Sequence, residues 1–120
     1  MTRTFKTAWF HKLARKAKIS DAALCKAVEQ FGLGQMVDLG GGVYKKRLDD
    51  NRQRAIILAR IGHFWVYEFL FAKNHRDNIS ESELMAFRLL VKSYKGLTSL
   101  QVQQLLDEGA FMEICHDHLS

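Results

Sequence analysis

The chain of 120 residues contains no proline, so glycines and helix-capping residues must provide its turns and helix ends. Its only two cysteines are Cys25 and Cys115, which is too few for a disulfide framework. The longest apolar run, Phe64–Ala72, is interrupted by Glu68 and is too short to span a bilayer. The N-terminus also lacks the apolar stretch of a secretory signal. We therefore expect a cytosolic protein without a membrane-spanning segment or a disulfide framework.

Acidic residues are absent from the first twenty positions, which carry six lysines and arginines. Positions 37–76 have eight basic against four acidic residues, whereas positions 77–120 have three basic and seven acidic residues. The net charge of +5 is thus unevenly distributed. A basic body with an acidic tail is typical of proteins that bind polyanions, because neutralised phosphates release condensed counterions. We expect a nucleic-acid partner, with an ordinary solvated surface as the alternative.

Hydrophobic periodicity predicts helices, then strands, then helices. The expected helices cover Ala8–Lys18, 20–31, and two segments that open with the capping boxes Ser80/Glu83 and Thr98/Gln101. The expected antiparallel strands are Val43–Leu48, Arg54–Ile61 and His63–Lys73, with a short strand at Thr4–Lys6 and an ambiguous segment at 111–120. This order predicts an α+β fold, in which an N-terminal helical hairpin packs on a small antiparallel meander and C-terminal helices follow. We expect one domain over residues 1–120, with a helical extension from about 97.

The segment Tyr44–Arg54 crowds cations into an expected β-hairpin. Because side chains alternate along a strand, Lys45 and Arg47 share one face and Lys46 lies on the other. A turn with an even number of residues places Arg47 opposite Arg54, whereas an odd turn separates them. Aligned cations without an interleaved acid cost stability, which favours an anion-binding face over a solvated one.

A second polar group follows the third strand, at Lys73, His75 and Arg76. Neighbouring cations favour a neutral imidazole, which can accept a proton from a ribose 2′-hydroxyl. Cleavage of RNA by its own 2′-hydroxyl needs a base, an acid and cations on the phosphate, and requires no metal. The candidates for these catalytic parts are Lys45, Arg47, Arg54, Lys73, His75 and Arg76.

The remaining cations of the hairpin and of the first helix are expected to contact RNA. These residues are Lys46, Arg52, Lys12, Arg15 and Lys16. No cofactor is indicated, because Gly40–Gly42 precedes a strand and so matches neither phosphate-binding glycine fingerprint. The Cys115–His118 segment carries metal-ligand types but lacks the second ligand pair of a structural zinc site, so we expect no metal.

These segments carry a resemblance that covers nearly the whole chain. Asp38–Leu48, with its Gly-Gly-Gly-Val-Tyr-Lys-Lys-Arg-Leu ending, and Asn51–Ile56 resemble the RelE/HigB-like toxins of type II bacterial toxin–antitoxin systems, within the RelE/ParE superfamily. The resemblance continues through Phe69–Ile79, Glu83–Arg88 and Glu113–Asp117.

The resemblance implies a small ribonuclease that cleaves mRNA in the ribosomal 30S A site and is neutralised by a cognate antitoxin protein. It further implies a toxin–antitoxin hetero-oligomer that binds operator DNA. The family's strand cations fall on Lys45, Lys46 and Arg47, and the arginine of its next strand falls on Arg54. A further family arginine and a C-terminal tyrosine fall on Asn74 and near Ser80, so these two roles are missing.

Relatives of the same fold inhibit DNA gyrase without cleaving RNA, and fold alone does not fix function. The alternatives are therefore a gyrase inhibitor and a nucleic-acid-binding regulator without catalysis. The retained cations Lys45, Arg47 and Arg54 favour RNA cleavage.

Overall fold

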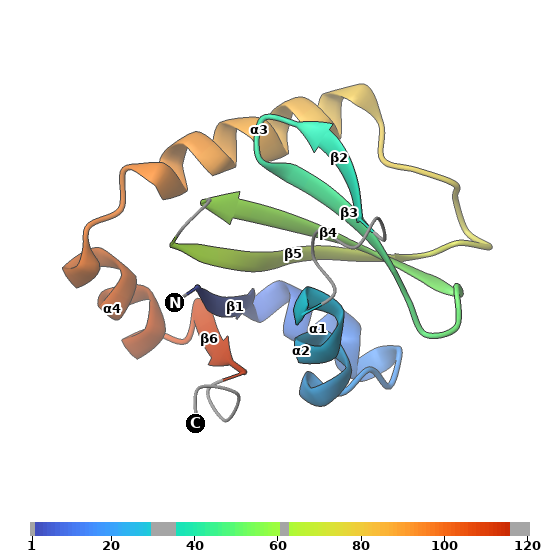
Figure 1. The fold of residues 1–120 in the computed structure, drawn as a ribbon, viewed down its shortest axis with the longest axis horizontal. Coiled ribbons are helices and arrows are strands. Elements are labelled where there is room, and N and C mark those ends of the chain that lie inside the picture. The colour runs from blue at the N-terminus through green and yellow to red at the C-terminus, as the bar shows by residue number, and fades with distance from the viewer. Residues whose placement is uncertain (1, 30–35, 61–62, 116–120) are drawn as a thin grey trace.

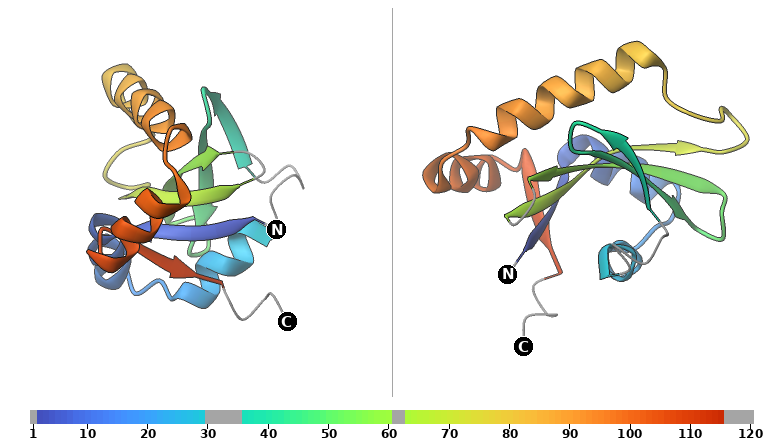
Figure 2. Two further views of the ribbon diagram at one scale, coloured as in Figure 1. Left: turned by 90° about the vertical axis from the view of Figure 1, so that its left-hand side faces the viewer. Right: turned by 45° about the horizontal axis from the view of Figure 1, so that its top comes forward.

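The computed structural model describes residues 2–29, 36–60 and 63–115. Within these residues, six strands form one sheet that four helices flank (Figure 1; Figure 2). The strands are β1 (Arg3–Thr7), β2 (Met36–Gly40), β3 (Val43–Leu48), β4 (Gln53–Arg60), β5 (Phe64–Ala72) and β6 (Phe111–Ile114). The helices are α1 (Ala8–Lys16), α2 (Asp21–Glu29), α3 (Glu81–Lys95) and α4 (Ser99–Asp107).

The sheet is mixed, with the strand order β2-β3-β4-β5-β1-β6. Strands β2 to β5 pair antiparallel in succession, as predicted for β3, β4 and β5, whereas β1 runs parallel to β5 and antiparallel to β6. The prediction of an N-terminal helical hairpin on an antiparallel meander was therefore wrong. The chain begins instead with a strand inside the sheet, and α1 and α2 carry it across one face to the distant edge strand β2 (Figure 1).

The first strand was underestimated because its sequence does not look buried. Phe5 is fully buried and packs on one face of the sheet, while Lys6, only 5% exposed, points to the other. A buried lysine is tolerated when its charge is paired. Asp21, at the start of α2, supplies that partner at 2.6 Å from Lys6 Nζ.

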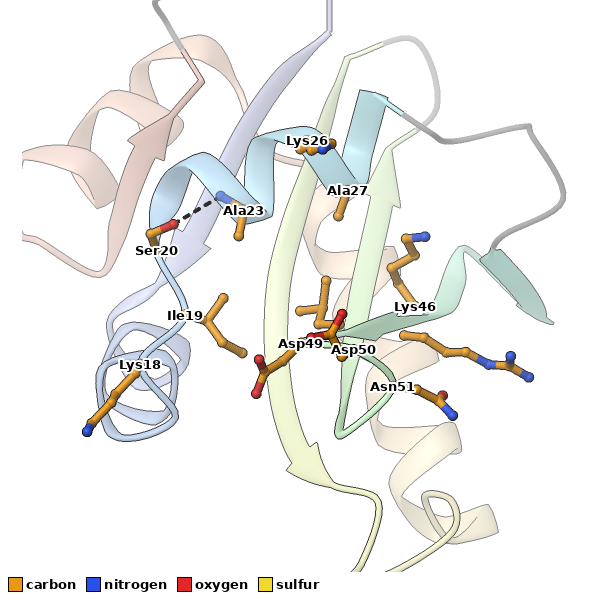
Figure 3. A pocket seen from close by; sticks show the side chains of 12 residues that line it. Lys18, Ile19, Ser20, Ala23, Lys26, Ala27, Lys46, Asp49, Asp50 and Asn51 are labelled. Carbon is orange, nitrogen blue, oxygen red and sulfur yellow. Dashed lines mark hydrogen bonds between the residues drawn. The ribbon is translucent and has the colours of Figure 1, made fainter.

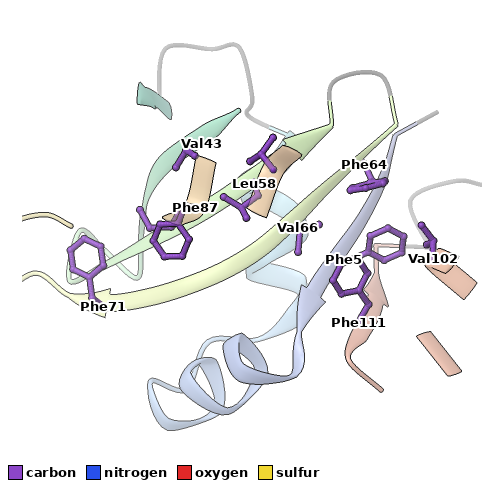
Figure 4. Packing of buried hydrophobic residues seen from close by; sticks show 11 residues of the cluster. Phe5, Val43, Leu58, Phe64, Val66, Phe71, Phe87, Val102 and Phe111 are labelled. Carbon is purple, nitrogen blue, oxygen red and sulfur yellow. The ribbon is translucent and has the colours of Figure 1, made fainter. Parts of the chain in front are cut away.

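The two faces of the sheet bury separate apolar clusters. On one face, Phe87 and Val91 of α3 pack against Val43 and Phe71 of the sheet (Figure 4). On the other, residues of α1 and α2 cover Ala55, Ile57, Tyr67 and Leu70. We refer to these as the α3 face and the α1/α2 face. Since α3 covers only part of its face, the sheet retains polar residues beyond it.

The capping boxes predicted at both later helices are confirmed. Ser80 and Glu83 cap α3 reciprocally, and Thr98 and Gln101 do the same for α4. The segment left ambiguous by the sequence contains β6, whose edge pairing with β1 is a long-range event that no local pattern announces. None of the helices among the described residues has the length and apolarity that crossing a bilayer demands.

The glycine triplet makes the tight connection between β2 and β3. Gly40, Gly41 and Gly42 all have positive φ. A Cβ on Gly42 would lie 2.7 Å from Val91 Cγ1, so only glycine lets α3 approach this turn. Arg88 of α3 donates hydrogen bonds to the carbonyls of Leu39 and Gly40 and so fastens the helix over the turn.

The two cysteines are too few for a disulfide framework, and the sequence did not indicate that they pair with each other. Cys25 of α2 and Cys115, which follows β6, form a disulfide with 5.4 Å between their Cα atoms. Spacing along the chain gave no hint of this, because 90 positions separate the two residues and the fold brings them together. Close by, Arg3 forms a bidentate pair with Glu113 of β6. The name β1–β6 edge is used below for the region that holds the Arg3–Glu113 pair, the Lys6–Asp21 pair and the disulfide.

Strand β5 contains a bulge at Glu68. Its neighbours pair as Ile56 with Phe69 and Ile57 with Tyr67, so Glu68 is one residue more than β4 offers. The Glu68 carboxyl is buried and accepts a 2.6 Å hydrogen bond from the Tyr94 hydroxyl of α3. Burial raises the pKa of Glu68, and the hydrogen bond from Tyr94 opposes part of that increase.

Candidate functional site

The β3–β4 hairpin places three cations on the α3 face, which is the arrangement expected for a turn with an even number of residues. Arg47 pairs directly with Arg54, and Lys45 pairs with Ile56. The turn between the strands has four residues, 49–52, which is the even number that this register needs. Residues paired across two antiparallel strands share a face. Lys45, Arg47 and Arg54 are hereafter called the hairpin cations.

The turn that sets this register adopts an uncommon conformation. Asp49, Asp50 and Asn51 all have φ between 50° and 73°, the left-handed region that Asp and Asn tolerate better than other non-glycine residues. The bent chain turns the Asn51 carbonyl toward Arg54, whose Nη1 donates to the carbonyls of Asn51 and Gln53 at 3.0 and 3.1 Å. These backbone contacts fix the guanidinium of a residue that is only 8% exposed, and they do not neutralise its charge.

Lys45 is held from the loop that precedes α3. Its Nζ donates to Asn78 Oδ1 at 3.3 Å, and the same oxygen accepts from the backbone N–H of Ile79 at 2.9 Å. The carboxamide therefore orients the lysine while leaving its charge uncompensated. Sequence reasoning missed Asn78, because a contact between residues 33 positions apart carries no local signal.

Arg76 lies over two aromatic rings on the same face. Its guanidinium is 5.2 Å from the ring centroids of Phe69 and Phe71, and Phe71 is the cross-strand partner of Arg54. Both terminal nitrogens of Arg76 also pair with Glu83, at 2.9 and 2.8 Å. This pairing, together with Ser80, holds the pKa of Glu83 down at about 2. Arg76 is thus the one member of the predicted catalytic set that has a carboxylate partner in the described structure.

Lys73 and His75 occupy the turn that leaves β5. Both are exposed, and a pocket of about 340 Å³ next to Lys73 is shared with Asn51, Arg52 and Gln53 of the neighbouring hairpin. The backbone N–H of Lys73 donates to the carbonyl of Arg52, which fastens this turn to the hairpin. The structure therefore brings the cations of the turn close to those of the hairpin strand, although only the backbone makes the contact.

Lys46 points away from the hairpin cations, as alternation requires. It is only 4% exposed and lies on the side of the hairpin that α2 covers, in the wall of a hollow of about 690 Å³ (Figure 3). Burial lowers the pKa of Lys46, and the charge of Arg47 lowers it further. A buried amine on the opposite face cannot join the hairpin cations on a single phosphate.

The other predicted RNA contacts are open to solvent. Lys12, Arg15 and Lys16 are exposed on α1, and the exposed Arg52 has only a 3.7 Å ion pair with Asp50. The helix therefore presents a basic outer face, on a different element from the hairpin. Among the described residues, no three His, Cys, Asp or Glu side chains form a group that could hold a metal ion. His116 to His118 fall outside the described residues.

The arrangement can bind one phosphate from several directions. Among the described residues, Arg47 has neither a hydrogen bond nor an ion pair, and the partners of Lys45 and Arg54 are uncharged oxygens. Guanidinium groups match phosphate oxygens in a bidentate geometry, and an ammonium adds a compact charge. Within the part of the chain that the structure describes, no carboxylate pairs with the hairpin cations, so their charge is open to an external anion.

The comparison with protein families gives one result. A family model described as the RelE toxin of the RelE / RelB toxin-antitoxin system matches residues 2–114. No curated protein and no solved structure matches the chain. The matched segment contains the hairpin cations, the turn after β5 and all of the strands and helices.

Proposed function

Because the chain belongs to the RelE toxin family, and that membership implies a cognate antitoxin, we propose that it is a toxin that cleaves messenger RNA on the ribosome. The observation that carries the proposal is the set of hairpin cations, which share one face and have no carboxylate partner among the described residues. Such a set suits the charge that develops on a phosphate during cleavage. We place the activity in the cytoplasm, with the 30S A site as the position of the message.

In the proposed reaction the 2′-oxygen of a ribose attacks the adjacent phosphorus while the bond from phosphorus to the 5′-oxygen breaks. The proton of the 2′-hydroxyl passes to a base, and an acid protonates the departing 5′-oxygen. The products are a 2′,3′-cyclic phosphate and a 5′-hydroxyl. The proposed reaction balances in atoms and protons without a cofactor or a metal.

We assign Arg47 and Arg54 to the phosphate and Lys45, oriented by Asn78, to the 2′-hydroxyl as base or charge stabiliser. Lys73 or His75 completes the site, because both are exposed on the turn fastened to the hairpin. Arg76, already paired with Glu83, acts as a positioning residue that holds this turn against β5. Lys46 is omitted from the RNA contacts because it is buried on the other face.

The exposed cations Lys12, Arg15, Lys16 and Arg52 are assigned to RNA outside the cleavage point. The family's arginine and tyrosine are replaced at Asn74 and near Ser80, so two of its site roles are missing. A ribosome partner is consistent with this, since ribosomal RNA can position a message that the toxin alone holds incompletely. We further propose that the toxin and its antitoxin form a hetero-oligomer that binds operator DNA. The basic charge of the chain favours such polyanion contacts.

The test is to map the 5′ ends of cellular messages after brief induction of the wild type, Arg54→Ala and Lys92→Ala. We expect new 5′ ends with the wild type and with Lys92→Ala, an exposed cation on α3, and none with Arg54→Ala. A melting curve confirms that Arg54→Ala is folded. The proposal is wrong if Arg54→Ala still cleaves, or if the wild type arrests growth with intact messages. DNA breaks with intact messages would indicate a gyrase inhibitor instead.

A further inference from the structure

A second basic hollow lies at the opposite end of the sheet from the hairpin cations. It has a volume of about 590 Å³, and its lining residues come from the end of β4, the start of β5 and the connection between α3 and α4. The junction of α3 and α4 lies at the left of Figure 1. The lining of this hollow includes Arg3, Arg60, His63 and Lys95 together with Leu97 and Ser99. We call it the far pocket. The function proposed above makes no use of it.

The far pocket has an unbalanced charge. Four of its lining residues are basic or imidazole side chains, and none is an aspartate or a glutamate. Arg3 is neutralised by its bidentate pair with Glu113, so the uncompensated charges come from Arg60 and Lys95. Neither forms an ion pair within the part of the chain that the structure describes.

Arg60 is held in the pocket wall before any ligand arrives. Its Nη1 donates to the carbonyl of Leu97 at 3.1 Å, immediately beyond the end of α3. One hydrogen bond occupies only part of a guanidinium that carries five N–H donors, so the remaining donors can serve an anion. This contact also ties the connection between α3 and α4 to the end of β4, but that role needs neither Lys95 nor a hollow of this size.

The helix that starts in the pocket is already capped. Thr98 and Gln101 satisfy each other's backbone N–H groups at the start of α4. An anion in the far pocket would therefore bind mainly to side chains. The lining offers the fork of Arg60 and the ammonium of Lys95, a combination of groups that suits a phosphate.

We propose that the far pocket binds a phosphate of the RNA backbone at a point remote from the cleaved bond. The choice of RNA as the source of that phosphate rests on the function proposed above. Arg54 and Arg60 lie at opposite ends of β4, six residues apart and so about 20 Å from each other. One phosphate cannot reach both. The far pocket consequently contributes affinity and placement, and the hairpin cations contribute chemistry.

The first experiment locates the site without any RNA. Inorganic pyrophosphate is titrated into the isotope-labelled full chain, and amide chemical shifts are followed by NMR. We expect saturable shifts at His63 and over Leu97–Val102, which Lys95→Gln reduces at equal pyrophosphate concentration. Shifts confined to the hairpin cations, or unchanged in Lys95→Gln, would overturn the proposal.

The second experiment measures RNA binding with an oligonucleotide whose 2′-O-methyl groups prevent cleavage. The dissociation constants of the wild type, Lys95→Gln, Arg60→Gln and the control Lys92→Gln are compared as salt is raised. Each lost phosphate contact should reduce the slope of log affinity against log salt by about 0.7. Lys95→Gln leaves the bond from Arg60 to Leu97 intact, so it reports on binding even if Arg60→Gln unfolds.

The outcomes separate this inference from the proposed function. Equal slopes for Lys95→Gln and Lys92→Gln overturn the RNA site, and so does an effect seen with duplex DNA but not with RNA. Intact messages in cells, combined with pyrophosphate shifts and a reduced RNA slope for Lys95→Gln, would refute cleavage while supporting the pocket. Cleaved messages with no response to pyrophosphate would do the reverse.

Discussion

The β1–β6 edge and the hairpin end of the sheet treat positive charge in opposite ways. At the edge, Arg3 and Lys6 each meet a carboxylate at 2.8 and 2.6 Å, and a disulfide closes the region. At the hairpin, Arg54 is held only by backbone carbonyls and Lys45 by a carboxamide. The same type of residue is therefore neutralised in one region and left charged in the other.

The difference separates cations that hold the fold from cations that wait for a ligand. A charge paired inside the chain stabilises the native state only when both partners are present. A charge left unpaired beside like charges costs some stability and gains it back on binding an anion. Removing residues from the edge should therefore change stability, whereas removing them from the hairpin should change activity.

The largest effect is expected at the disulfide. Breaking the bond between Cys25 and Cys115 opens a loop of 90 positions, for which the chain-entropy relation gives about 4–5 kcal/mol of lost stability. Urea unfolding with and without a reducing agent measures the change. A Cys25→Ser/Cys115→Ser variant serves as the control, because its midpoint should ignore the reductant. Equal midpoints for the oxidised and reduced wild type would show that the disulfide does not stabilise the β1–β6 edge.

The next effect is on activity at the hairpin. Arg47→Ala should lower the cleavage rate on ribosome-bound message about 100-fold, because one donor to the developing phosphate charge is lost. Its free energy of unfolding should change by less than about 0.5 kcal/mol, since Arg47 is exposed and has no partner among the described residues. The cleavage rate of Arg47→Lys, which keeps the charge without the planar guanidinium, should lie between those of the wild type and Arg47→Ala. A variant that cleaves normally would contradict the contrast between the two regions.

A smaller loss of stability is expected from breaking one ion pair of the edge. Asp21→Ala leaves the buried Lys6 without a counter-charge and should cost about 2 kcal/mol, less than a fully buried pair because Asp21 is half exposed. Adding Lys6→Met should recover most of the loss, since a paired charge is then replaced by an apolar side chain. Chemical denaturation of the single and double variants measures the coupling. Additive losses would show that the pair does not act as a unit.

The smallest effect is the pH dependence of stability that comes from the Arg76–Glu83 pair. It is an ion pair, like those of the β1–β6 edge, but it lies on the same face as the hairpin cations. The pKa of Glu83 in the folded chain is depressed to about 2, so its contribution is complete above the ordinary carboxyl range near 4.5. That contribution is lost as the pH falls from about 4.5 to 2. Solvent screening limits it to less than about 1 kcal/mol. Glu83→Gln should flatten this part of the stability curve, and an unchanged curve would refute the assignment.

The sequence predicted those parts of the fold that depend on neighbouring residues. The caps at Ser80 and Thr98 follow from local side-chain chemistry. The register of Arg47 against Arg54 depends on the parity of a short turn, and the sequence left an even and an odd turn open. The parallel placement of β1 was missed, because the interval between β1 and β5 leaves no periodic trace and the strand is short.

The candidate site was predictable in composition and less so in its contacts. The alternation of side chains along a strand is enough to separate Lys45 from Lys46, and the burial of Lys46 on the α2 side agrees with that separation. The pairing of Arg76 with Glu83 and the support of Lys45 by Asn78 depend on how the loop after β5 returns to α3. Only the folded chain specifies that path. The catalytic roles themselves stay predictions.

The bulge at Glu68 changes the parity of β5 partway along its length. Before it, the even-numbered Phe64 and Val66 face α3; beyond it, the odd-numbered Phe69 and Phe71 do. The two halves of β5 therefore point even-numbered and odd-numbered side chains, respectively, toward α3. The single inserted residue at the bulge causes this change. Losing that residue would turn the platform beneath Arg76 to the other side of the sheet while leaving the composition of the strand almost untouched. The one extra residue in β5 thus allows the same strand to face the core with Phe64 and Val66 and to support Arg76 with Phe69 and Phe71.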